Sequence, residues 1–375
     1  MASPLLEPFR FANGVVAANR VWLAPMTNLQ SHPDGSLSIA ERNWLLRRAD
    51  GGFGVIQTCA SHVSEDGQGW QGEMGIHSDR HLPGLSALAA DLVARGATGI
   101  VQLFHAGLRA DSKLTGLRSW SASAGEEGGV AFQAGSHEDI QRVIGEFRDA
   151  AVRACAAGFH GVELHGAHGY LFGQFLSVIE NRRSDGWGGS LANRARLLRD
   201  TVRAIRAAVP STFVVGVRLS PEDSGHARGL DLDESLAVAG WLCQDGVDFL
   251  HLSLHDAARN TTKRPRNHAV TLFREAVERS VPLVVAGQIW TRAQAEELLE
   301  LGAGGVALAR CAIANPDWPR QIEVPGWQPR RPPLSVDELV DRGLSRPFAI
   351  NMGIWWPGFV DDAAVQERKL SEPAA

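Results

Sequence analysis

The stretch FVVGVRLS, residues 213–220, shows the pattern that decides the fold: an apolar run of strand length whose only charge, Arg218, lies near its end. Such a run is typical of a parallel strand buried on both faces. Similar runs are VWLAPM (21–26), FGVIQTCA (53–60), TGIVQLFHA (98–106), HGVELH (160–165), VDFLHLS (247–253), PLVVAG (282–287) and GGVALA (304–309). Eight strands with helices between them predict a (β/α)8 TIM barrel of the α/β class, and this count favours the barrel over an open doubly wound sheet.

Helix signals occur between the later strands. Ser136 and Asp139 have the spacing of a capping box, and apolar residues then recur at helical spacing until Gly158. Further helices are predicted over residues 193–208, 234–245 and 292–301, each of which ends before a glycine or a proline.

Two segments lie outside the strand and helix alternation. Residues 9–20 carry apolar runs on either side of Asn13-Gly14, and this dipeptide predicts a β-hairpin because it adopts positive φ at little cost. We expect the hairpin to cap the bottom of the barrel. Residues 108–135 are rich in Gly, Ser and Ala without clear periodicity, and they are predicted to form a long loop or a lid.

The barrel pattern covers residues 1–322 as one domain. Residues 323–375 are predicted to be a C-terminal extension that packs on the barrel or on a neighbouring subunit, an arrangement that allows a homo-oligomer. Trp355 and Trp356 lie in an apolar run of this extension. We hypothesise that they form an aromatic cap over an active site, although tryptophans at such positions, like Trp290, more commonly pack structurally.

Composition and charge restrict the class of protein. The 375 residues are 44% hydrophobic and 21% charged, as in globular proteins, and the net charge of -5 with a pI near 6.2 provides no basic surface for nucleic acid or anionic lipid. Four cysteines are scattered singly, so neither a disulfide framework nor a metal site is predicted. The N-terminus has no secretory pattern and no run is long enough to span a membrane. These features predict a cytoplasmic protein.

Polar residues follow several of the predicted strands, where a TIM barrel places its active site. Gly287 and Arg310 end the last two strands, and they are suited to phosphate because glycine lets backbone N–H groups approach and a guanidinium binds bidentately. The nearby glycines of GAGG (302–305) are equally typical of helix stops and tight turns.

Six motifs together carry a family resemblance. They are APMT (24–27), QLFHAG (102–107), VELHGAHGYLFGQFLS (162–177), VGVRLSPED (215–223), VDFLHLS (247–253) and ARCAIANPDW (309–318). In this order, from about residue 5 to about residue 320, the chain resembles the Old Yellow Enzyme family of FMN-dependent ene-reductases.

The resemblance implies FMN across the barrel mouth, with NADH or NADPH as its reductant. The Thr27 hydroxyl would bond the flavin O4, Gln102 would contact the ring edge and Arg218 would lie near N1. The implied cofactor-binding residues are Ala24, Pro25, Met26, Thr27, Ala60, Gln102, His165, Arg218, Gly287, Ala309 and Arg310.

The resemblance also implies the chemistry and its catalytic residues. His165 and His168 would donate hydrogen bonds to the carbonyl oxygen of an activated alkene, a hydride from flavin N5 would add to the β-carbon, and Tyr170 would protonate the α-carbon. A phenol is a weak enough acid to hold its proton at neutral pH. Tyr170 is the only tyrosine of the chain.

Two other functions remain open from the sequence. Tyr170 could instead act as a base in a flavin-dependent dehydrogenation or isomerisation of a cyclic ketone. A metal-dependent barrel hydrolase would use Glu163, His165, His168 and His251 as ligands, although the full ligand spacing is missing. Arg109, after the HAG motif, would either contact the flavin or anchor a loop.

Overall fold

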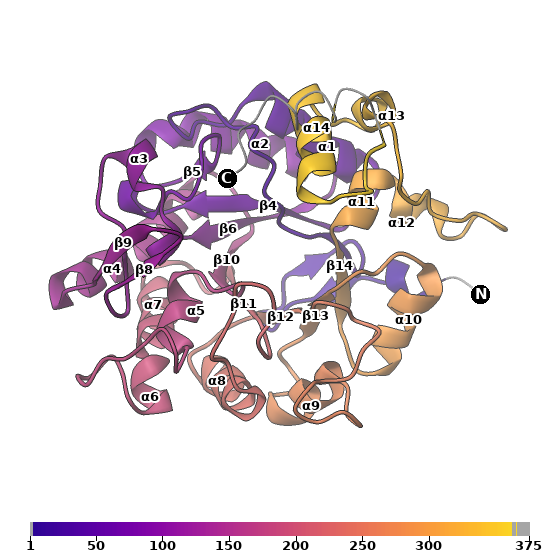
Figure 1. Ribbon diagram of the computed structural model, residues 1–375. Helices are drawn as coiled ribbons and strands as arrows, with labels where there is room; N and C mark the ends of the chain where they lie inside the picture. The colour runs from indigo at the N-terminus through magenta and orange to yellow at the C-terminus, as the bar shows by residue number, and fades with distance from the viewer. Residues whose placement is uncertain (1–2, 362–364, 366–375) are drawn as a thin grey trace.

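The computed structural model describes residues 3–361 and 365 of the chain. All eight predicted strands are present and form a closed parallel barrel with helices around it, because β3 pairs with both β14 and β4 (Figure 1). The barrel strands are β3 (Val21–Leu23), β4 (Val55–His62), β6 (Thr98–Phe104), β10 (Gly161–Gly166), β11 (Val214–Leu219), β12 (Phe249–Ser253), β13 (Leu283–Ala286) and β14 (Gly305–Leu308). Every residue of these strands is buried, which explains why they lack a polar face in the sequence.

The helices that follow the strands carry the predicted signals. The Ser136 hydroxyl and the Asp139 carboxylate form the capping box of α4. Helix α8 begins two residues earlier than predicted, because Asp231 caps its first turn, and the predicted helix over 193–208 is interrupted at Ala195. The main helices are α1 (Ile39–Asp50), α2 (Leu82–Ala94), α4 (His137–Ala156), α6 (Leu191–Arg194), α7 (Arg196–Ala208), α8 (Leu232–Gln244), α9 (Ala269–Ala276) and α10 (Arg292–Glu300). Shorter elements are η1 (Pro4–Leu6), η2 (Glu65–Gly67), β5 (Met74–Gly75), η3 (Asp79–His81), η4 (Gly107–Arg109), α5 (Leu171–Leu176), α11 (Arg310–Ala314) and α12 (Trp318–Gln321).

The N-terminal hairpin caps the barrel as expected. Its strands β1 (Phe9–Arg10) and β2 (Val16–Ala17) pair antiparallel. The Phe9 ring packs against Trp22 at a centroid distance of 5.0 Å, and Phe11 packs against Phe249 at 5.7 Å. Since both partners lie on barrel strands, the hairpin closes the barrel interior at the end opposite to the predicted active site.

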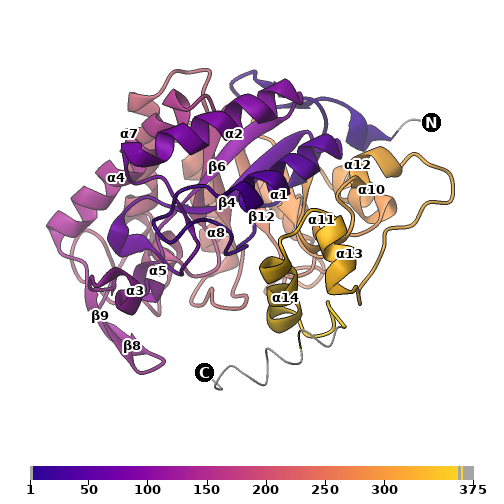
Figure 2. The same ribbon diagram turned by 90° about the horizontal axis from the view of Figure 1, so that it is seen from above.

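The segment 108–135, predicted as a long loop or a lid, is an excursion from the barrel but contains regular secondary structure that was not predicted. This segment contains α3 (Ser112–Thr115) and a three-stranded sheet of β7 (Trp120–Ser121), β8 (Gly125–Glu127) and β9 (Val130–Ala134), which projects from the barrel (Figure 2). Strands β8 and β9 are mostly exposed, so they do not show the apolar alternation that would have revealed them.

The C-terminal extension forms α13 (Val336–Asp341) and α14 (Arg346–Trp355), which lie beside α1 and α11 in both views (Figures 1 and 2). The Phe348 ring meets Trp44 of α1 edge-on at 5.3 Å. The rest of the predicted extension, residues 362–364 and 366–375, lies outside the described residues. Within the described part of the chain, no helix combines the length and the apolar character that a membrane span requires.

Candidate active site

Strand register brings the predicted site residues together at the C-terminal ends of the barrel strands. His165 of β10 is level with Arg218 of β11, and Arg218 is level with His251 of β12. Two residues earlier on β10, Glu163 is level with Gln102 of β6, and Gln102 is level with Ala60 of β4. Because side chains alternate along a strand, Glu163 and His165 occupy the same face of β10.

Three aromatic side chains from the end of β10 and the loop after it form the centre of the site. The ring of His165 lies 5.0 Å from that of His168 and 5.0 Å from that of Tyr170, in both cases nearly perpendicular. The Tyr170 ring also packs edge-on against Phe104 at 4.6 Å. The chain therefore keeps its only phenol between the imidazole of His165, which in turn contacts His168, and the apolar ring of Phe104.

The loop conformations at this end of the barrel are unusual. Among the described residues, three that are not glycine adopt positive φ: Leu29 at 53°, His168 at 60° and Gln288 at 53°. Each of them follows a barrel strand. Backbone strain of this kind costs of order 1 to 3 kcal/mol per residue and is concentrated at functional sites.

The two imidazoles are neutral at pH 7. Burial holds the pKa of both His165 and His168 well below the usual value, and the neighbouring Arg218 lowers both further. The Ala167 N–H donates to His165 Nδ1 at 3.3 Å, so the proton of the neutral ring is on Nε2. His165 can therefore donate a hydrogen bond from Nε2.

The phenol of Tyr170 holds its proton firmly. Burial raises its pKa to about 12, and the negative charge of the buried Glu73 acts in the same direction. At neutral pH the side chain is thus available as an acid but not as a base.

A serine that the sequence analysis did not single out joins two of the predicted residues. Ser253, the last residue of β12, accepts a hydrogen bond from Arg218 Nη2 at 3.0 Å, and its Oγ lies 2.7 Å from His168 Nε2. The Ser220 hydroxyl accepts a hydrogen bond from the His168 backbone N–H at 3.1 Å. Ser253 ends β12 and Ser220 directly follows β11, and these positions at strand ends were the signal that could have identified them.

Gln102 is oriented by the buried carboxylate of Glu163, which also contacts His251. Its Nε2 donates to Glu163 Oε1 at 2.7 Å, and His251 Nδ1 lies 2.8 Å from Glu163 Oε2. Burial raises the pKa of Glu163, but His251 and Arg218 outweigh this effect, so the pKa is lowered and the carboxylate is ionised.

These hydrogen bonds use atoms that the alternative function, a metal-dependent hydrolase, would need as metal ligands. Both oxygens of Glu163 face Gln102 or His251, and His168 Nε2 faces Ser253. Across residues 3–361 and 365, no three His, Cys, Asp or Glu side chains are grouped so that they could hold a metal ion. The structure therefore provides no metal centre for that alternative among the residues described.

The segment after β3 lies at the barrel mouth. Ala24 and Pro25 are buried, and the Ala24 N–H donates to the Leu308 carbonyl at 3.0 Å, which ties the first barrel strand to the last. Met26 is partly buried and Thr27 is exposed. Ala60 belongs to a small apolar cluster with Phe104, Ala106 and Ala110, against which Trp70 and Tyr170 pack.

Gly287, Ala309 and Arg310 lie after β13 and β14. A Cβ atom at Gly287 would come within 2.8 Å of the Leu254 carbonyl oxygen, so this close approach requires glycine. The Arg310 side chain is half-buried, and its guanidinium forms no hydrogen bond or ion pair with any residue from 3 to 361 or with residue 365. The GAGG glycines lie elsewhere: Gly302 follows α10, and Gly305 packs against Phe9 of the hairpin.

Arg109 anchors a loop. Its guanidinium donates to the Gly169 carbonyl, next to Tyr170, and to Glu127 of β8 at 3.1 Å. Arg228 also donates to Glu127, at 2.7 Å. These charges hold the projecting sheet against the Tyr170 loop.

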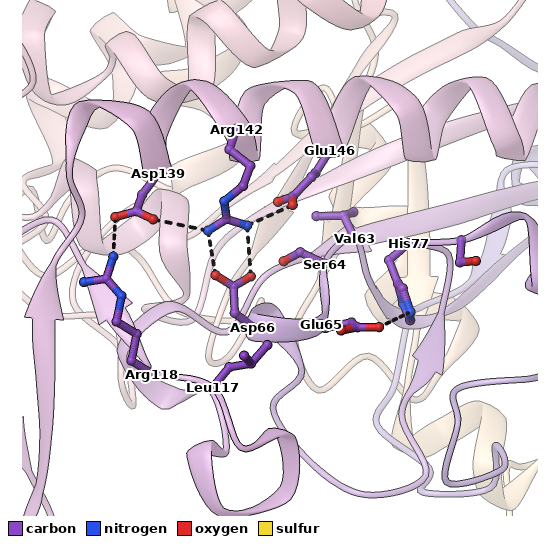
Figure 3. Close-up of a pocket in the computed structure, with 11 residues that line it drawn as sticks. Val63, Ser64, Glu65, Asp66, His77, Leu117, Arg118, Asp139, Arg142 and Glu146 are labelled. Carbon is purple, nitrogen blue, oxygen red and sulfur yellow. Dashed lines mark hydrogen bonds and ion pairs between the residues drawn. The ribbon is translucent and has the colours of Figure 1, made fainter.

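A cavity of about 540 Å³ lies between α4 and the segment around η2, apart from the predicted site residues (Figure 3). Its centre is Arg142, which forms ion pairs with Asp66, Asp139 and Glu146. The charges that line this cavity are thus largely paired with each other.

The side chains at the barrel mouth fit FMN. Arg218 is buried and its Nε has no hydrogen-bond partner among the described residues. Arg310, after β14, is a second cation without an anionic partner there. Two such cations suit the electron-rich pyrimidine edge of a flavin and its phosphate. The Gln102 backbone N–H donates to the Thr58 hydroxyl, and its side-chain amide donates to Glu163. Together with Arg218 and Arg310, Gln102 would hold the cofactor.

Known proteins give the same picture. The profile of the NADH:flavin oxidoreductase / NADH oxidase family matches residues 4–325. The chain is 34% identical over 328 residues to the probable NADH-dependent flavin oxidoreductase YqiG of Bacillus subtilis, which covers 85% of this chain and 88% of that protein. It is 33% identical over 331 residues to an NADH:fumarate oxidoreductase of Klebsiella pneumoniae, with 85% of this chain but only 36% of that longer protein covered.

A solved structure agrees with these relatives. The Old Yellow Enzyme homologue of Zymomonas mobilis superposes with a TM-score of 0.79 at 26% identity, and the match covers 91% of this chain and 96% of that one. The barrel, the two arginines at its mouth and the family match lead to one conclusion. The chain belongs to the Old Yellow Enzyme family and is an FMN-dependent oxidoreductase that takes its electrons from NADH or NADPH.

Proposed function

We propose that the protein reduces the C=C bond of α,β-unsaturated carbonyl compounds. The observation that carries this proposal is the grouping of His165, His168 and Tyr170, whose rings lie 5.0 Å from one another in two pairs at the barrel mouth. Two neutral imidazoles and one protonated phenol provide donors for a substrate oxygen and an acid for a substrate carbon.

His165 and His168 would bind the carbonyl oxygen. Negative charge develops on this oxygen when a nucleophile adds to the β-carbon, and preorganised donors in a site shielded from water stabilise that charge. The Nε2 proton of His165 is free for this role, because Nδ1 accepts from the backbone. Ser253 would keep the His168 ring in place, and it would couple that ring to Arg218.

Tyr170 would protonate the α-carbon of the resulting enolate. FMN, when bound, supplies the hydride that adds to the β-carbon. Arg109 would keep Tyr170 in position through its hydrogen bond to the Gly169 carbonyl. Burial of the phenol would disfavour loss of its proton, and a negative charge on Glu73 would act in the same direction.

The raised pKa of Tyr170 favours reduction over the second candidate. A dehydrogenation or isomerisation of a cyclic ketone would require the phenolate as a base, and a phenol with a pKa of about 12 is almost fully protonated at neutral pH. The relative named for fumarate supports conjugated carbonyl compounds as the substrate class, and we extend this class to the present chain as part of the proposal.

The test is an anaerobic titration of the purified yellow enzyme. NADH or NADPH should bleach the flavin absorption, and 2-cyclohexenone or fumarate should restore it with formation of the saturated product. Cyclohexanone, which has no C=C bond, serves as the matched control and should leave the enzyme bleached. If oxygen alone restores the colour and no alkene is consumed, the protein is an oxidase and the proposal is wrong.

A further inference from the structure

The guanidinium of Arg310 lies over an aromatic ring of the C-terminal extension. The Arg310 Cζ lies 4.4 Å from the centroid of the Trp356 ring. This distance is within the range of a cation–π contact, for which tryptophan is the strongest partner. Arg310 forms no hydrogen bond or ion pair with the other described residues, and burial lowers its pKa from the usual value.

The backbone that carries the indole is held in place by the fold of the extension. Trp356 directly follows α14, its backbone N–H donates to the Met352 carbonyl at 3.1 Å, and its backbone carbonyl accepts from the Phe359 N–H at 2.8 Å. The next link is Leu334, whose N–H donates to the Phe359 carbonyl. Helix α14 is itself docked on α1 through Phe348. The ring over Arg310 is therefore part of a built structure.

A guanidinium over an aromatic ring can still bind an anion. When arginine stacks on an aromatic face, which is a common arrangement for its planar group, the N–H donors point outward in that plane. The contact thus removes conformational freedom from a long side chain and shields one face from water, and both effects strengthen a bidentate bond to phosphate.

We infer that Trp356 is a positioning residue that holds Arg310 for the phosphate of FMN, so that the C-terminal extension forms part of the cofactor site. This inference rests on the proposed role of Arg310 as a phosphate ligand. The inference also predicts a difference between two flavins. Binding of FMN should depend on Trp356, whereas binding of riboflavin, which lacks the phosphate, should not.

The adjacent tryptophan provides a matched control. Trp355 is 37% exposed and Trp356 is 45% exposed, so the two indoles are similarly accessible. Trp355 lies near Phe348, at a centroid distance of 6.5 Å, and not over Arg310. Replacement of either residue removes an indole from the same helix end, but only one replacement removes the contact with the guanidinium.

The experiment compares flavin binding by Trp356→Ala, Trp355→Ala and Arg310→Ala enzymes. Flavin-free protein is titrated with FMN and with riboflavin, and binding is followed by the quenching of flavin fluorescence. We expect Trp356→Ala to raise the Kd for FMN between about threefold and thirtyfold, the range of a cation–π contact. The Kd for riboflavin should stay within twofold, and Trp355→Ala should leave both values within twofold. Trp356→Leu keeps an apolar side chain without a ring face and should resemble Trp356→Ala.

Three results would overturn the inference. The first is an unchanged Kd for FMN in both Trp356 variants, and the second is an equal loss of FMN and riboflavin binding, which would indicate a general effect on the fold. The third is a further loss when Trp356→Ala is added to Arg310→Ala, because a residue that acts through Arg310 has no effect once Arg310 is gone. If Arg310→Ala itself leaves the FMN Kd unchanged, the assignment of the phosphate site fails, which is a different failure.

Discussion

The only tyrosine of the chain stands against a histidine: the rings of Tyr170 and His165 are 5.0 Å apart between centroids, with 74° between their planes. His165 lies near the end of β10 and Tyr170 directly precedes α5, five positions later in the sequence. The strand end and the helix start thus present a phenol and an imidazole to the same space at the barrel mouth.

The first prediction concerns the acid. Tyr170→Phe should slow the reoxidation of the reduced enzyme by 2-cyclohexenone by about 100-fold or more, because it removes the proton donor and keeps the ring that packs against Phe104. Reduction of the flavin by NADPH should change less than twofold, because that step requires no proton for the alkene. Stopped-flow absorbance measures both half-reactions, and an alkene step within twofold of the native rate would refute the role of Tyr170.

The second prediction is the pH dependence of the alkene step. An acid is present below its pKa, so a phenol with a pKa of about 12 is still almost fully protonated at pH 10, where an ordinary tyrosine has lost half its protons. The lowered pKa values of His165 and His168 keep both rings neutral from pH 7 upward. The rate of reoxidation by enone should therefore be flat from pH 7 to 10. A rate at pH 10 of half the neutral value or less would contradict this.

The third prediction concerns the serine between His168 and Arg218. Ser253→Ala removes the hydroxyl that both side chains contact, and one hydrogen bond contributes on the order of 1 kcal/mol, or about fivefold in rate. We expect the alkene step to slow by about five- to tenfold. Ser280→Ala, at an exposed position outside the barrel mouth, is the control and should react as the native enzyme does. Equal rates for the two variants would show that the bridge is dispensable.

The fourth prediction tests the close approach at Gly287. An added methyl group would meet the Leu254 carbonyl and the Ala257 nitrogen, at 2.8 and 2.9 Å, so Gly287→Ala should lower the free energy of unfolding by about 1 to 3 kcal/mol. Gly186→Ala meets no atom within 4 Å and should change it by less than about 0.5 kcal/mol. Urea denaturation of the flavin-free proteins measures both values. A Gly287→Ala protein as stable as the control would mean that the loop moves without cost.

Much of the fold could be predicted because its strands, helix caps and turns depend on residues that are close together in the sequence. A parallel strand buried on both faces is a continuous apolar run, and all eight runs became barrel strands. The Ser136 capping box and the Asn13-Gly14 turn also involve residues close in sequence. The small sheet of β7, β8 and β9 escaped prediction, because exposed strands need no apolar pattern.

The contacts of the candidate site also fall into two groups, those between residues close in sequence and those between distant residues. The sequence by itself determined that His165, His168 and Tyr170 lie near one another, because a strand end and a helix start only a few residues apart can hardly separate them. Only the tertiary structure decided which distant groups they meet: Ser253 lies 85 residues from His168 in sequence. Helices α12, α13 and α14 separate Arg310 from Trp356 in the sequence, and the contact between the two side chains depends on how α14 docks. Such contacts follow from strand register, barrel closure and helix packing, which are set by the whole core and not by any local pattern.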